Sequence, residues 1–423
     1  MREVNQRFSK LDTSSKVLKL VKRDMVLDSL RGASAWLDAA VDGAGVVGKC
    51  CRNALYHEDG RVTWLYPNSN TAESISAWLK LGELLGDPTK VDQAKLYADT
   101  MLDDTVRGLW NDPAAPEAFG LPWYWTDGGT YSSIYAMRIP IYLSQLYQAT
   151  GCDRYLSVSD GIGETLLNRM LDSGIVSAAW DPKTGWMHEV RVGARVMYSV
   201  ATFAKLWQMT GKEKYRVGYD KSVAALLRMQ NEDGSFYQQY DPRTGEALDT
   251  SIKFHFVAYL LNILQCAYEA MGDTRLVDCG ARLADHLCGT FYYRHTVPYC
   301  GGTGLEAPDQ MEADGSIQDS CNGLLWLFEV TGTSVYRDVA LKLWMELWMH
   351  QIPQDNEAGW AGAIMRGVTP SYTETLAGVP SNRKHLHFDP TVVARCDIWF
   401  VANHVFASER LLQLIGKDCI SEA

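Results

Sequence analysis

A short phrase centred on a glycine recurs along the chain and constrains the fold more than any other feature. In each copy an apolar stretch ends at a glycine, and a tyrosine or leucine often follows four positions later, as in Gly151…Tyr155. The copies stand at Gly86, Gly151, Gly211, Gly272, Gly332 and Gly416, so successive spacings are 65, 60, 61, 60 and 84 residues. A repeat of this length fits a helical hairpin that buries its apolar face only by stacking on its neighbours. Six copies therefore predict a closed ring of six hairpins.

The glycine has a physical role in each copy. Helices commonly end in a residue of left-handed conformation, which glycine adopts without steric cost. A second helix that starts within a few residues must run antiparallel to the first. We expect the aromatic or aliphatic residue four positions on to pack back across the turn.

The expected helices form two sets, which predict an all-α fold of the (α/α)6 type over residues 1–423 as one domain. Helices after a glycine mix charged and apolar residues, which indicates an outer layer. They begin near Thr89, Cys152, Lys212, Thr274 and Ser334, and an N-terminal helix from about Ser15 to Val41 makes six. Helices before a glycine are apolar nearly all round, which indicates an inner layer. They are expected at residues 71–85, 131–147, 194–209, 252–270, 316–330 and 391–414.

Long loops lead from each outer helix to the next inner helix and must gather on one face of the ring. Three of them, at residues 54–67, 178–190 and 237–249, have a turn sequence between short apolar flanks, which predicts small β-hairpins. The others span residues 107–130, 290–315 and 351–389. Loops on a rigid scaffold are where function concentrates, so we look for the site on this face.

Composition excludes several classes of function. The net charge is -11, and no basic run appears, which argues against nucleic acid as a partner. No segment resembles a signal peptide or a membrane span. The ten cysteines have neither metal-ligand spacing nor a small secreted frame, so we expect free thiols, no metal or other cofactor, and a cytoplasmic location.

Six inner and six outer antiparallel helices joined at glycine turns resemble the six-hairpin glycosidase-like superfamily. Within it, WTDGGTYSSIYAMRIPIYLSQLYQATGCDRYL (residues 125–156) is similar to a segment of the unsaturated uronyl hydrolases. In those enzymes an aspartate precedes an inner helix, and the position that matches it here is Asp127. The resemblance implies a hydrolase that acts on an uronate-bearing oligosaccharide.

Carboxylates near the starts of the inner helices are the candidate acids: Glu73, Asp127, Glu189, Asp249, Asp319, Asp389 and Asp397. Glycoside hydrolysis needs a pair of carboxyl groups, one of them kept protonated by its surroundings. Asp127 and Asp249 precede the second and fourth inner helices, so they could face each other across the ring. Each could instead cap the helix that follows it. His188 is a further acid or base candidate, because the pKa of histidine lies near neutrality.

The expected substrate-binding residues are aromatic, basic and polar side chains of the loop face and the first turns of the inner helices. Indole and phenol rings stack on the apolar faces of sugars, and arginine neutralises a carboxylate. The set comprises Trp64, Tyr66, Trp123, Trp125, Tyr131, Arg191, Arg195, His255, Asp319, Trp360 and His387. Packing of these aromatics in the floor of the cavity is the alternative.

Three functional hypotheses remain open from the sequence. The first is carboxylate-assisted glycoside hydrolysis, with Asp127 as general acid/base and Asp249 or His188 as its partner. The second is a polysaccharide lyase or sugar epimerase that uses tyrosine or histidine with arginine, for which Tyr131, Tyr135 and Tyr259 are available. The third is a toroid that binds a glycan or a biosynthetic intermediate without catalysis. The oligomeric state is left open.

Overall fold

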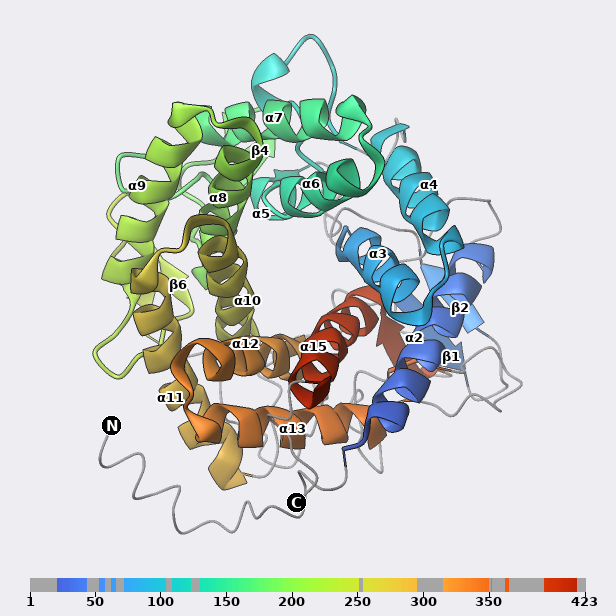
Figure 1. Ribbon diagram of the computed structural model, residues 1–423. Helices are drawn as coiled ribbons and strands as arrows, with labels where there is room; N and C mark the ends of the chain where they lie inside the picture. The colour runs from blue at the N-terminus through green and yellow to red at the C-terminus, as the bar shows by residue number, and fades with distance from the viewer. Residues whose placement is uncertain are drawn as a thin grey trace.

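The helices of the protein form two concentric rings (Figure 1). The computed structural model describes residues 21–43, 53–57, 62–65, 72–103, 109–122, 130–250, 254–294, 315–349, 351, 362–364 and 392–416. Within these ranges the inner ring consists of α3 (Glu73–Leu85), α6 (Ile139–Thr150), α8 (Tyr198–Thr210), α10 (Phe254–Met271), α12 (Gly315–Thr331) and α15 (Ile398–Gly416). The outer ring consists of α2 (Arg23–Gly43), α4 (Thr89–Asp103), α7 (Asp153–Asn168), α9 (Glu213–Met229), α11 (Thr274–Arg294) and α13 (Ser334–Met349). The predicted layers are confirmed.

Each inner helix packs on the next, and α15 packs on both α12 and α3, which closes the ring. The core fills the space between the two rings, and its largest fully buried side chains include Trp36, Trp78, Trp326 and Trp344. None of the described helices is long and apolar enough to cross a membrane.

Five of the six turn glycines adopt the left-handed conformation that the sequence predicts. Their φ values are 69° at Gly86, 67° at Gly151, 64° at Gly211, 66° at Gly272 and 71° at Gly332. The sixth copy differs, because Gly416 is the last residue of α15 and is not left-handed. The threonine before three of these glycines also has a role, since Oγ1 of Thr150 donates to the carbonyl of Leu146 and accepts from the amide of Cys152.

The residue four positions after the glycine packs differently from the prediction. Instead of folding back across its own turn, Tyr155 reaches the preceding outer helix, where its hydroxyl donates to Asp99 at 3.1 Å. Tyr215 donates to Asp160 at 2.8 Å, and Tyr336 donates to Asp285 at 2.8 Å. The repeated tyrosine therefore links neighbouring outer helices.

The three predicted β-hairpins are confirmed. They pair β1 (Asn53–His57) with β2 (Val62–Leu65), β4 (Ala179–Asp181) with β5 (Gly185–Trp186), and β6 (Gln239–Tyr240) with β7 (Ala247–Asp249), all antiparallel. The second hairpin gains β3 (Tyr131–Ser132), which pairs with β4. Short α5 (Ser133–Ala136) and 3-10 turns at Pro116–Ala118 (η2) and Ala194–Met197 (η3) complete the described elements.

Three of the expected inner helices need correction. Residues 392–397 are not helical but form strand β8 (Val392–Asp397), which pairs antiparallel with β1. The helix expected at 131–147 is broken into α5 and α6, because Pro140 lacks the amide proton that an uninterrupted helix needs. Arg195 lies in the 3-10 turn before α8 rather than inside the inner helix.

Candidate functional site

One residue in or just before each inner helix stands at the same distance in sequence from the turn glycine, and these six positions are called the axial belt here. Each lies thirteen residues before the glycine that ends or follows its helix. The members are Glu73, Arg138, Tyr198, Tyr259, Asp319 and Asn403. Four of the six are charged or amide residues and the other two are tyrosines, although the inner helices are otherwise strongly apolar. The belt lies at the first or second turn of each inner helix, on the side of the ring where the long loops enter.

Arg138 joins four helices of the inner ring in the belt. It is the residue before α6, and its Nη2 lies 2.7 Å from Oε1 of Glu73 on α3. The same nitrogen donates to the hydroxyl of Tyr198 on α8 at 2.9 Å. The guanidinium carbon stands 4.7 Å from the ring centroid of Tyr198 and 5.3 Å from that of Tyr259 on α10. Because a single side chain reaches three other inner helices, the guanidinium lies within the ring.

Burial sets the electrostatics of this pair. Glu73 is 1% exposed and Arg138 is 3% exposed. Burial raises the pKa of Glu73 to about 7, against the opposing effect of the Arg138 guanidinium. Neither carboxylate oxygen of Glu73 accepts an aligned hydrogen bond from another described residue, so the contact with Arg138 is an ion pair. A carboxyl group of this kind can take up or release a proton near neutral pH.

Tyr142 extends the belt toward α15. Its ring stacks on Phe406 at 6.5 Å between centroids, although α3 lies between α6 and α15 in the ring. Burial raises the pKa of Tyr142, and the Glu73 carboxylate adds to the rise. The phenol therefore stays protonated and lines the ring interior beside the ion pair.

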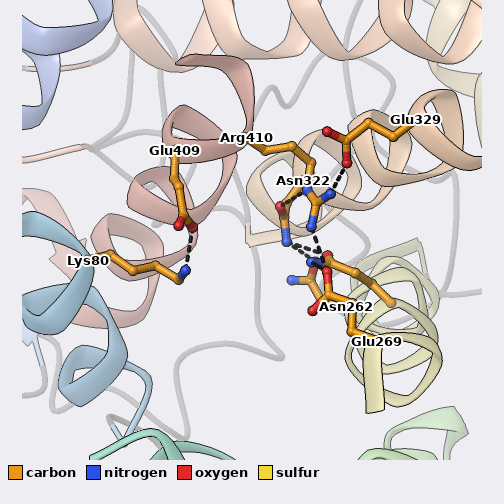
Figure 2. Close-up of polar contacts among 8 residues, drawn as sticks. Lys80, Asn262, Glu269, Asn322, Glu329, Glu409 and Arg410 are labelled. Carbon is orange, nitrogen blue, oxygen red and sulfur yellow. Dashed lines mark hydrogen bonds and ion pairs between the residues drawn. The ribbon is translucent and has the colours of Figure 1, made fainter. Parts of the chain in front are cut away.

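A second polar network fills the other end of the ring interior (Figure 2). Arg410 on α15 pairs with Glu329 on α12 and with Glu269 on α10, the latter at 2.8 Å. Asn322 donates to Asn262 at 2.9 Å and to Gln265 at 2.8 Å. Lys80 on α3 pairs with Glu409 on α15. In this network carboxylates and an amide pair with the half-buried guanidinium of Arg410, which is the arrangement expected of a structural cluster.

The hairpins of the loop face bring several predicted residues together. Arg191 donates to the side chain of Gln239 at 3.2 Å, and Gln239 stands opposite Asp249 in the β6–β7 pair. Asp249 is the last residue of β7, and the described part of α10 begins at Phe254.

The β3–β4–β5 sheet contains the predicted residue Tyr131, and His188 follows its last strand. Tyr131 packs against Trp110 and Trp180, with ring centroids 4.9 and 5.6 Å apart. This half-buried ring is part of an aromatic cluster, and burial raises its pKa. His188 is hydrogen-bonded through Nδ1 to Ser177, which fixes the orientation of the imidazole. Arg195 is half-buried in η3, just before α8.

The remaining predicted residues are placed by backbone alone or not at all. Trp64 lies in β2, His255 in α10 and Asp319 in α12, but their side chains are outside the described residues. Asp127, Tyr66, Trp123, Trp125, Trp360 and His387 lie wholly outside them. In the part of the chain that the structure describes, no group of three or more histidine, cysteine or acidic residues could hold a metal ion. Arg138 is absent from the sequence-based candidates, although counting back from each turn glycine would have found it.

Comparison with known proteins identifies the fold of the two-ring helical architecture. Residues 168–282 match the family model described as pectic acid lyase. No curated protein matches the chain. A solved unsaturated glucuronyl hydrolase specific for heparin superposes with a TM-score of 0.66 at 14% identity, covering 93% of this chain and 99% of that one. The chain has the (α/α)6 toroid fold.

Two further toroids give the same result. The unsaturated glucuronyl hydrolase of Streptococcus agalactiae has a TM-score of 0.66 at 14% identity, covering 93% of each chain. The enzyme of Bacillus sp. GL1, described as responsible for the degradation of glycosaminoglycan, has a TM-score of 0.66 at 14% identity, covering 92% of this chain and 97% of that one. A variant of the S. agalactiae enzyme is solved in complex with dGlcA-GalNAc6S.

Proposed function

We propose that the protein is a glycoside hydrolase that acts on an unsaturated, uronate-bearing oligosaccharide. The observation that carries the proposal is the buried Glu73–Arg138 pair in the axial belt of a toroid. A guanidinium and a protonatable carboxyl among the inner helices suit an acidic sugar, and the toroids solved as unsaturated glucuronyl hydrolases share this architecture over more than nine-tenths of the chain. We take residues 1–423 as one catalytic domain.

In this proposal Asp127 is the general acid/base, and Asp249 or His188 is its partner. The structure supports the partners in two ways. The hydrogen bond from Ser177 orients His188, and the β6–β7 hairpin holds Asp249 beside the side chain that Arg191 contacts. General acid/base groups contribute roughly 10²–10⁴-fold to a rate.

The test is a panel of unsaturated uronate disaccharides followed by ultraviolet absorbance. Hydrolysis removes the absorbance of the unsaturated ring, so the signal should fall with time. Asp127→Asn should lower the rate by about 10²–10⁴-fold without changing the unfolding transition. Asp181→Asn is the control, because Asp181 accepts the Lys183 amide at 2.7 Å in a loop turn. Wild-type activity in the Asp127→Asn variant would show that Asp127 is not the general acid/base.

A lyase is the second candidate, and two observations favour it. Residues 168–282 match the pectic acid lyase model, and the Tyr198 hydroxyl accepts a hydrogen bond from Arg138, which places a cation beside a tyrosine that a lyase could use as its base. A lyase would create ultraviolet absorbance from a saturated polyuronate instead of removing it. A toroid that only binds glycans would gain thermal stability with ligand and show neither signal.

A further inference from the structure

The buried ion pair of the axial belt is electrically neutral as a whole, and an acidic substrate would change that charge. Glu73 and Arg138 together carry no net charge, and both are nearly fully buried. A carboxylate brought to Arg138 would leave the buried group with a net negative charge. Such a charge is costly in a low-dielectric interior. Neutrality returns if Glu73 takes up one proton as the substrate carboxylate arrives.

We infer that the uronate carboxylate of the substrate replaces Glu73 as the ion-pair partner of the Arg138 guanidinium, and that Glu73 binds one proton in exchange. The inference rests on the proposed function for its substrate class. Atoms and charges balance, because one proton from solvent joins the Glu73 carboxylate and the ion pair with Arg138 passes to the substrate. No covalent bond other than the new O–H forms or breaks. Glu73 is thus a positioning residue, which acts through Arg138.

Local structure supports this exchange. Neither oxygen of Glu73 accepts an aligned hydrogen bond from another described residue, so protonation disturbs only the interaction with its own backbone amide and the ion pair with Arg138. Arg138 immediately precedes α6, a helix of 12 residues, and the positive end of the helix dipole favours an anion at that point. Burial also raises the pKa of Glu73 to about 7, which makes proton uptake cheap near neutrality.

The other groups that face the pair include tyrosines and a cysteine, and burial raises the pKa values of Tyr142 and Cys266. Among the described residues they are Tyr142 of α6, Tyr198 of α8 and Tyr259 of α10, together with Cys266 of α10, which acts on Tyr142. On the α15 side Asn403 and Phe406 are uncharged. Asp319 of α12 occupies the equivalent position of the belt, and its side chain is outside the described residues. Glu73 is therefore the described group whose titration can offset the substrate charge.

The experiment is isothermal titration calorimetry of the whole protein with a saturated glucuronic acid disaccharide, in two buffers of different ionisation enthalpy. At pH 8 we expect uptake of about one proton per bound ligand, and at pH 6 uptake close to zero. The dissociation constant should be about tenfold weaker at pH 8 than at pH 6, because only the protonated fraction of Glu73 is competent. The neutral glucose counterpart should bind without proton uptake.

Variants make the assignment specific. Glu73→Gln should abolish the proton uptake and make the dissociation constant for the uronate independent of pH. Glu329→Gln is the matched control, since Glu329 pairs with Arg410 at the other end of the ring interior and should leave the uptake intact. If Glu73→Gln fails to fold, the wild-type uptake still decides the matter.

Two outcomes separate this inference from the proposed function. Binding of the uronate by the wild type without proton uptake at pH 8 would overturn the exchange, even if unsaturated substrates are hydrolysed. Proton uptake that Glu73→Gln abolishes, in a protein that hydrolyses none of the panel, would support the exchange and remove the hydrolase proposal.

Discussion

His404 shows how a single buried residue ties the ring together. It lies on α15 with no exposed surface, and its Nε2 is 2.7 Å from the hydroxyl of Ser29 on α2. The imidazole stacks on Trp344 of α13 with centroids 5.8 Å apart. Burial lowers the pKa of His404 to about 3. The histidine is therefore neutral in the folded protein throughout the physiological range.

This burial predicts an acid-sensitive stability. The unfolded chain binds a proton at His404 below pH 6.5, whereas the folded protein does so only near pH 3, so stability is lost as pH falls through this window. The slope should reach at most about 1.4 kcal/mol per pH unit. In urea unfolding at pH 7, 6, 5 and 4, His404→Gln should show a flatter decline than the wild type. Equal slopes with unchanged m-values would show that His404 does not titrate in this way.

At the scale of the element, substitution of a turn glycine can distinguish the free-energy cost of backbone conformation from the cost of a steric clash. A Cβ added at Gly151 would meet no atom within 4 Å, so only the left-handed conformation opposes a side chain there. The same open space surrounds Gly416, which is helical rather than left-handed. The two glycines thus share open space for a Cβ and differ in backbone conformation.

Gly151→Ala should destabilise the protein by about 1–2 kcal/mol, the cost of a left-handed alanine. Gly416→Ala should be neutral or stabilising by up to about 1 kcal/mol, because alanine favours the helix. Differential scanning calorimetry of both variants measures the contrast. A loss of stability at Gly416 as large as that at Gly151 would contradict the conformational explanation.

The elements also show what the sequence could and could not predict. The glycine repeat predicted the six hairpins of helices, the charge pattern of the helices predicted the two layers, and the turn sequences predicted the three β-hairpins, because helix ends and tight turns depend on local residues. Residues 392–397 were expected to be helical, since their strand character depends on β1, which lies more than 300 positions earlier in the chain. Tertiary pairing of that kind overrides local propensity.

The candidate site was harder to predict for a related reason. Glu73 was a candidate acid by its position, yet its ion pair depends on Arg138 and two tyrosines from three other helices. Burial raises the pKa of Glu73, and burial is a property of the assembled ring rather than of the residue. Asp249 remains a candidate by position, since it ends β7 and pairs with Gln239 of β6.

At the scale of the molecule, the two ends of the chain meet along one seam of the ring. Strand β8 pairs with β1, His404 contacts Ser29, and Glu409 pairs with Lys80. Adjacent residues of α15 carry opposite charges, and Glu409 faces α3 while Arg410 faces α10 and α12 (Figure 2). This order of charges suits only one orientation of α15 between its neighbours.

Reversing one charge at the seam should therefore lower the stability of the protein, and reversing the partner charge as well should restore it. Lys80→Glu and Glu409→Lys should each destabilise the protein by about 1 kcal/mol or more, because each places like charges together in a partly buried site. The double variant should recover most of the loss, as measured by a double-mutant cycle in urea at low salt. The within-helix pair Arg216–Asp220, reversed in the same way, is the control away from the seam. Additive losses in the double variant would show that Lys80 and Glu409 do not interact.

The seam has a consequence for how the protein is made. Among the described elements α15 is the last inner helix to be synthesised, so the faces of α12 and α3 that contact it stay uncovered until then. Translation proceeds at roughly 5–20 residues per second, so the apolar side of α3 stays exposed for some tens of seconds. A nascent chain in this state is an unclosed ring with exposed apolar faces on α3 and α12. It is therefore the form to which we expect chaperones to bind.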